Sequence, residues 1–106
     1  MAAEHINEIV TQIREKLSKT DLSCLPEKLA VQFNLTGRIS GIFYIEVLGG
    51  NLSVEPYEYI DKDGSVSITI TNLKKLIAGK LPADDSKISV EGNEQKVRTI
   101  LGLFSN

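Results

Sequence analysis

Few residues of this sequence could do catalytic chemistry, and none of them falls in a pattern that catalysis requires. His5 is the single histidine and Cys24 the single cysteine. A catalytic histidine needs a rigid partner that orients its ring, whereas His5 lies close to the start of the chain. Cys24 lies close to Leu22 and Leu25 in the sequence, so we interpret it as a small buried apolar residue. The sequence shows no grouping typical of a serine hydrolase, a zinc site or an iron–sulfur site.

The segment DKDGS, from Asp61 to Ser65, resembles part of a calcium-binding loop but lacks its decisive ligand. With Asp61 and Asp63 at the third and fifth positions, Gly64 falls correctly at the sixth. The twelfth position would then be Ile70, where such loops place a bidentate glutamate. We therefore interpret Asp63–Gly64 as a turn that leads the chain into the next strand.

Gly79–Lys80 similarly resembles the end of a phosphate-binding loop. Lys74 stands where that motif has its earlier glycine, and no serine or threonine follows Lys80. We interpret Gly79 as a helix terminus. Lys74, Lys75 and Lys80 are interpreted as a solvated cationic cluster, with attraction for anionic lipid head groups as the alternative. We accordingly expect no metal ion, no cofactor and no catalytic residue.

The composition is that of a soluble globular protein. Of the 106 residues, 42% are apolar and 25% are charged, so we expect a single domain spanning residues 1–106. The net charge of −2 argues against nucleic acid as a partner, because neutralising phosphates requires clustered cations. One cysteine cannot form an internal disulfide, and no apolar run approaches the roughly 20 residues of a membrane span. We therefore expect a cytoplasmic protein whose membrane contact is peripheral at most.

The elements that would position a site are clearest between Ser65 and Leu81, SVSITITNLKKLIAGKL, where the hydrophobic period changes. The first half has the two-residue period of a strand with one buried face, carried by Val66, Ile68 and Ile70. The second half has helical spacing, carried by Leu73, Leu76 and Ile77. A strand therefore leads directly into a short amphipathic helix.

Capping residues support this change of period. Thr71 or Asn72 can accept a hydrogen bond from the first free amides of the helix. Gly79 suits the left-handed residue that closes a helix, and Pro82 prevents its continuation.

Similar patterns predict the other elements. Helical spacing indicates a helix over residues 4–19 and a final helix after Asn93, with an apolar stripe of Val97, Ile100, Leu101 and Phe104. A period of two indicates strands over 29–36, over 42–48, from Leu52 and around Ile88, with a tight turn at Gly49–Asn51. Pro56 ends the third strand or places it at an edge. The segment 55–64 has no sustained period and is long enough for a crossover.

The predicted order is helix, three strands, crossover, strand, helix, strand, helix, which is an α+β pattern. Each helix has a single apolar stripe, so the simplest packing places all three helices on one face of one sheet. The second strand also carries Ile42, Tyr44 and Leu48 on its other face, which is more apolar than contact with solvent requires. The surplus of apolar surface is explained either by a filled core or by a cavity for a hydrophobic ligand.

Three segments, together with this order of elements, resemble the sterol carrier protein 2 lipid-binding family: GIFYIEVLGGNLSV (41–54), SITITNLKKLIAGKL (67–81) and ISVEGNEQKVRTILGLF (88–104). Their similar features are a T-I-T-type run, a helix of the form L-x-x-L-x-x-G-K-L, a strand ending in Gly-Asn and a final Leu-Phe. The resemblance covers nearly the whole chain. It implies a five-stranded mixed, mainly antiparallel sheet with helices on one face.

The resemblance further implies a hydrophobic tunnel between sheet and helices that binds and transfers a fatty acid, an acyl-CoA or a sterol-like lipid without chemistry. The ligand is then expected to lie against Phe33, Ile68, Leu76, Ile77, Val97, Leu101 and Phe104. In this family the segment before the last strand commonly lines the tunnel with apolar residues, whereas PADDSK, 82–87, is shorter and polar. The alternative is a non-catalytic interaction or regulatory module with a filled core, which dimerises through the face of Ile42, Tyr44 and Leu48.

Overall fold

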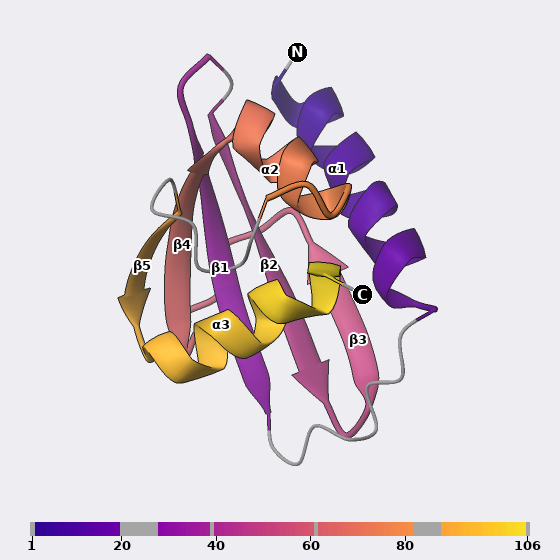
Figure 1. The fold of residues 1–106 in the computed structure, drawn as a ribbon, viewed down its shortest axis with the longest axis vertical. Helices are drawn as coiled ribbons and strands as arrows, with labels where there is room; N and C mark the ends of the chain where they lie inside the picture. The colour runs from indigo at the N-terminus through magenta and orange to yellow at the C-terminus, as the bar shows by residue number, and fades with distance from the viewer. Residues whose placement is uncertain (1, 20–27, 39, 61, 82–87, 106) are drawn as a thin grey trace.

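A computed structural model describes residues 2–19, 28–38, 40–60, 62–81 and 88–105. These residues form a five-stranded sheet with three α-helices packed on one of its faces (Figure 1). The strands are β1 (Leu29–Thr36), β2 (Gly41–Leu48), β3 (Asn51–Glu55), β4 (Gly64–Thr69) and β5 (Ser89–Gly92). The helices are α1 (Ala2–Leu17), α2 (Ile70–Ile77) and α3 (Glu94–Gly102), and a short 3₁₀ helix, Leu103–Ser105, follows α3.

The strand order in the sheet is β3-β2-β1-β4-β5. The central pair, β1 and β4, is parallel, and the other three pairs are antiparallel. The predicted α+β class and the mixed, mainly antiparallel sheet with helices on one face are therefore confirmed. The two-residue turn Gly49–Gly50 joins β2 to β3, with φ values of +59° and +82° that glycine adopts without strain.

The core lies between the sheet and the helix layer. Register pairs Phe33 of β1 with Phe43 of β2 and with Val66 of β4, so these three side chains share the face toward the helices. Ile13 and Leu17 of α1, Leu73 and Leu76 of α2, and Ile100 and Leu101 of α3 meet them, and all of these residues are fully buried. The apolar stripes predicted on the helices and the apolar faces predicted on the strands therefore form one buried layer.

The start of α2 differs from the prediction. The helix begins at Ile70, and its N-cap is Thr69, whose Oγ1 accepts a hydrogen bond from the Asn72 amide at 3.2 Å. Thr71 or Asn72 as the capping residue is therefore wrong. Ile70 is buried, as it would also be on a strand, so its hydrophobicity could not mark the change of period. At the other end Gly79 has the predicted left-handed conformation, with a φ of +76°, and Pro82 lies outside the described residues.

The predicted crossover, between β3 and β4, passes over the face of the sheet opposite to the helices. On that face the Tyr59 amide donates a hydrogen bond to Oε1 of Gln32 at 3.1 Å. Asp63 then fixes the end of the crossover to the start of β1. Its amide donates to the Ala30 carbonyl at 2.7 Å, and its carboxylate accepts from the Ala30 amide at 2.8 Å. Asp63 therefore aligns β4 with β1, as the turn interpretation of Asp63–Gly64 requires.

Gly64 tests the contact between the sheet and α3. A Cβ at Gly64 would lie 2.5 Å from Cγ2 of Val97 and 2.7 Å from the carbonyl oxygen of Glu91. We predict that Gly64→Ala lowers the free energy of unfolding by about 1 to 3 kcal/mol, because helix and strands must move apart. Gly102 in α3 is the matched control, since a Cβ there would meet nothing within 4 Å. Gly102→Ala should leave stability unchanged or raise it by up to about 1 kcal/mol, and equal losses in urea unfolding would contradict the contact.

Candidate functional site

The seven residues predicted to contact a ligand are brought together in one apolar cluster. Phe33 and Ile68 come from the sheet, Leu76 and Ile77 from α2, and Val97 and Leu101 from α3; Phe104 lies in the 3₁₀ helix. Six of the seven are at most 2% exposed, and Ile77 is partly buried against the same cluster. The cluster therefore extends across the boundary between the sheet and the helices, where the predicted tunnel would run.

Phe33, one of the seven residues, packs against a second aromatic ring of the core. The rings of Phe33 and Phe43 stack with centroids 4.9 Å apart and planes inclined by 5°. Neither of the two pockets described below is lined by any of the seven residues. The polar segment 82–87, Cys24 and the side chain of His5 lie outside the described residues. Contact between a ligand and the seven residues therefore stays a prediction.

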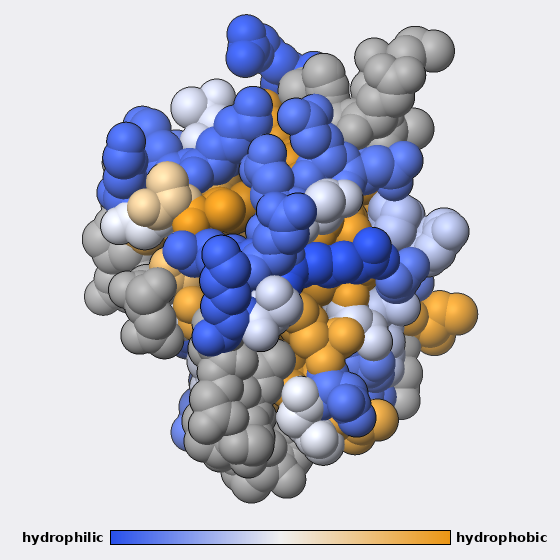
Figure 2. Space-filling view, turned by 90° about the vertical axis from the view of Figure 1, so that its right-hand side faces the viewer, coloured by the Kyte–Doolittle hydropathy of each residue, from blue (hydrophilic) through white to orange (hydrophobic). Residues whose placement is uncertain are grey.

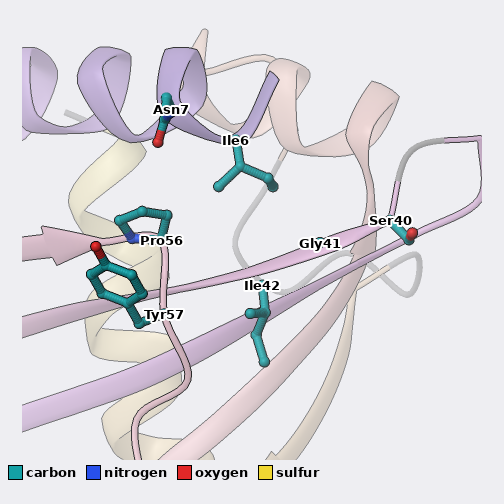
Figure 3. A pocket seen from close by; sticks show the side chains of 7 residues that line it. All are labelled: Ile6, Asn7, Ser40, Gly41, Ile42, Pro56 and Tyr57. Atoms are coloured by element: carbon teal, nitrogen blue, oxygen red, sulfur yellow. The ribbon is translucent and has the colours of Figure 1, made fainter. Parts of the chain in front are cut away.

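A pocket of about 400 Å³ lies at the edge of the sheet, where α1 begins (Figure 3). Its wall is formed by Ile6 and Asn7 of α1, by Ser40, Gly41 and Ile42 at the start of β2, and by Pro56 and Tyr57 after β3. Ile6 lies on the helix side of β2 and Ile42 on the other side, so the pocket passes around the strand edge. The sequence analysis did not predict this pocket. Two residues could have indicated it: Gly41, which has no side chain, and Pro56, which ends a strand.

A second pocket, of about 310 Å³, has a more polar wall at the start of β4. It includes Lys62, Asp63, Ser65 and Glu91. Asp63 is already engaged there, because its carboxylate binds the Ala30 amide and lies 3.4 Å from Nζ of Lys96. Among the described residues, no group of three or more His, Cys, Asp or Glu side chains is placed to hold a metal ion.

The crossover builds a polar cluster on the open face of the sheet. The Tyr59 hydroxyl donates a hydrogen bond to the Glu46 carboxylate at 2.5 Å, and the Tyr59 ring meets the Tyr44 ring edge to face with centroids 4.9 Å apart. Nζ of Lys28 lies 5.0 Å from the centre of the Tyr59 ring. Tyr44 is consequently half-buried, whereas Leu48 is 53% exposed. The apolar face expected from Ile42, Tyr44 and Leu48 is thus partly covered by the chain itself.

The pKa values of both tyrosines in this cluster are raised. The hydrogen bond to Glu46 is the main cause of the raised pKa of Tyr59, while a hydrogen bond with Lys28 acts in the opposite direction. Burial is the main cause of the raised pKa of Tyr44, followed by the negative charges of Glu55 and Glu46. Both side chains therefore stay neutral at physiological pH, and the cluster has a structural role in holding the crossover on the sheet.

We predict that the Tyr59–Glu46 hydrogen bond makes stability depend on alkaline pH. Below about pH 10, the ordinary tyrosine pKa, Tyr59 is protonated whether the protein is folded or unfolded, so the bond contributes fully. As the pH rises through 10, the unfolded chain loses its proton first and stability falls. Tyr59→Phe should be less stable at pH 7 and show a shallower decline above pH 9.5 in chemical denaturation. Glu46→Gln should also make the decline shallower, and an unchanged decline in both variants would contradict this role.

The fold is that of the sterol carrier protein 2 domains. The chain superposes over 92% of its length on a structure described as UbiJ-SCP2, a ubiquinone synthesis protein, with a TM-score of 0.68, 19% identity and 94% of that chain covered. The palmitated SCP2L2 from Aedes aegypti gives a TM-score of 0.68, 16% identity and 92% coverage of each chain. The resemblance seen in the sequence is confirmed at the level of the fold.

The same fold is also found inside a larger enzyme. The sec-alkylsulfatase Pisa1 from Pseudomonas sp. matches 74% of this chain with a TM-score of 0.60 and 15% identity, but only 13% of that enzyme is covered. No family model matches the sequence, and the search of curated proteins found no match. Among the described helices, none combines the length and the apolar character that would be needed to cross a membrane.

Substitution of Leu76 measures whether the cluster is packed or open. Leu76 is fully buried, so Leu76→Ala should lower the free energy of unfolding by about 2 to 5 kcal/mol through lost burial and the cavity that remains. Ile77→Ala is the matched control one position further along the same helix, and it should cost about half as much or less because Ile77 is only partly buried. A loss at Leu76 no larger than at Ile77 would show that Leu76 borders open space.

Proposed function

We propose that this protein is a non-catalytic lipid-binding and lipid-transfer domain. It holds the apolar part of a fatty acid, an acyl-CoA or a sterol-like lipid between the sheet and the helices, against the seven residues of the predicted site. The observation that carries the proposal is the shared fold over 92% of the chain with a protein whose structure is described as palmitated. The continuous apolar cluster across the boundary between sheet and helices supports the same site.

Entry of a ligand between the described side chains of the cluster would separate a helix from the sheet, because six of the seven residues are at most 2% exposed. Helix α2 is held by fewer buried residues than α1. It buries Ile70, Leu73 and Leu76 only, whereas α1 buries Ile6, Ile9, Val10, Ile13 and Leu17. Apolar ligand surface entering the cluster contributes about 25 cal/mol per Å² before the costs of ordering the ligand, and it offsets the separation of α2 from the sheet.

The proposal assigns the protein to the cytoplasm, as a single domain spanning residues 1–106 whose membrane contact is peripheral. Lys74, Lys75 and Lys80 are all exposed, on α2 and just after it. Exposed cations beside the moving helix suit a brief contact with anionic head groups. No step of the proposal requires a catalytic residue, a cofactor or a metal ion.

A filled-core interaction module is the second candidate. The stacked Phe33–Phe43 pair and the full burial of most of the predicted site favour it. In that case dimerisation would use the open face at Ile42, Tyr44 and Leu48. The Tyr59 ring already covers part of Tyr44, so this face offers less apolar area than the sequence indicates.

The two candidates predict different results for the purified protein. If the chain binds lipid, solvent extraction releases fatty acids or other apolar molecules, and a fluorescent fatty acid binds saturably at one site. A polyprenylated phenol should be titrated in parallel, because one protein of the same fold is described as a ubiquinone synthesis protein. A dimer in sedimentation with no extracted lipid and no saturable binding would instead support the interaction module.

A pair of variants locates the binding site. Ile77→Ser should weaken fatty-acid binding about tenfold, which corresponds to about 1.4 kcal/mol and is within the value of one buried isoleucine. Ile60→Ser is the matched control, because Ile60 is 91% exposed and lies in the crossover on the other face. Equal affinity of the two variants would place the ligand elsewhere.

A further inference from the structure

The pocket at the edge of β2 has a structural cause in the short β3. Pairing between β2 and β3 ends at Tyr44 and Glu55, and the chain then turns away at Pro56. Among the described residues, the first three of β2 therefore have no neighbouring strand on that side. Leu48 and Asn51, which flank the two-residue turn, form a hydrogen-bonded pair, and such pairs alternate along an antiparallel ladder. Counting back from Leu48, the amide and carbonyl groups of Ile42 therefore point toward the side where β3 is missing.

Ile6 separates this pocket from the interior. It lines the pocket, and it also belongs to the apolar cluster of the core, with 5% of its surface exposed. Gly41 leaves the space that Ile6 occupies, since a Cβ at Gly41 would lie 2.5 Å from Cδ1 of Ile6. The side chain of Ile6 is thus laid directly over the backbone of β2.

Apolar side chains behind Ile6 connect the pocket to the predicted ligand site. Gly41 and Phe43 are two residues apart on the same face of β2, which separates them by about 7 Å. Phe43 stacks on Phe33, one of the seven residues expected to contact the ligand. A short, continuous apolar path therefore joins the pocket, past Ile6, to the site between sheet and helices.

The attachment of α1 differs along its length. In its last turn Arg14 forms an ion pair with Glu55 and donates a hydrogen bond to the Val54 carbonyl at 2.6 Å, which fixes the helix to β3. At the other end the described contact with β2 is the apolar packing of Ile6 on Gly41. Figure 2 views the molecule from the α1 side, where hydrophilic side chains cover most of the surface and hydrophobic surface shows between them. Arg14 therefore anchors the last turn of α1, and Ile6 meets β2 through apolar contact.

We infer that this pocket is the mouth through which a single acyl chain reaches the interior, and that Ile6 is its gate. The inference rests on the proposed lipid-binding function. Ile6, Ile42 and Pro56 supply an apolar wall, none of the described residues that line it is charged, and Asn7 and Ser40 are exposed at the rim. This chemistry admits an apolar tail first and leaves a polar head group at the rim, where amide and hydroxyl groups can bind it. A volume of about 400 Å³ is within the range of small-molecule sites.

The test is the rate of binding of a fluorescent fatty acid, measured by stopped flow. Ile6→Ala should raise the association and dissociation rates together by about tenfold, equivalent to lowering a barrier by about 1.4 kcal/mol, with little change in affinity. Ile6→Trp should lower both rates by a similar factor, because the larger side chain closes the mouth. Ile13→Ala is the matched control, since it removes the same side chain from the same helix at a fully buried position that does not line the pocket. Because Ile13 packs in the core cluster, a second control is Ile60→Ala, which removes the same side chain at a 91% exposed position outside both the cluster and the pocket. The rates of Ile60→Ala should match those of the unchanged protein, and Ile13→Ala should not raise both rates as Ile6→Ala does.

The outcomes separate the gate from the function. Unchanged rates in both Ile6 variants, with the unchanged protein still binding the fatty acid, would overturn the gate and leave the proposed function intact. No binding by the unchanged protein would overturn the function itself. Thermal melting of each variant shows that it is folded. If Ile6→Trp does not fold, Tyr57→Ala provides the second test, because removing a ring that is 63% exposed at the mouth should raise both rates without unfolding the core.

Discussion

The parallel pairing of β1 with β4 is the constraint on which the rest of the arrangement depends. Strand β4 lies on the far side of β1 and runs in the same direction as β3, so the chain between β3 and β4 has to cross a face of the sheet. Helices occupy one face, and the crossover therefore takes the other. There it buries Gln32 and half-buries Tyr44. Asp63 completes the crossing by binding both backbone groups of Ala30, which sets the register between the two central strands.

This constraint also explains where the molecule is open. To begin its crossing, the chain must leave the edge of the sheet at Pro56, before β3 has covered the start of β2. The uncovered edge is then available to the first turns of α1, which rest on it through Ile6 and Gly41. The pocket is thus a consequence of the same topology that fixes the centre of the sheet. Because the pocket lies beside the helix layer, it is close to the proposed ligand site between the sheet and the helices.

The elements themselves could be predicted closely because each depends on local pattern. Alternation along Leu29–Thr36 and the two glycines after Leu48 give the strands and hairpin that the structure contains. Asn93 caps α3 as expected, with its side chain accepting from the Lys96 amide at 3.2 Å. The prediction failed at Thr69, where a buried isoleucine satisfies both periods and the cap depends on where the backbone turns. The hydrophobic period of a segment predicts neither the order of the strands in the sheet nor the face over which the crossover passes.

The predicted site illustrates the same division. Periodicity and resemblance selected seven apolar residues, and the structure places them in a single cluster because each lies on the inward face of its element. Their spacing could not show that Phe33 stacks on Phe43, since that contact joins two strands. It also could not reveal the pocket, whose wall combines residues near positions 6, 41 and 57. The sequence by itself determined which faces are apolar and where the chain turns, because these depend on neighbours along the chain. Only the tertiary structure decided how those faces are filled and where an opening remains, because both depend on contacts between distant segments.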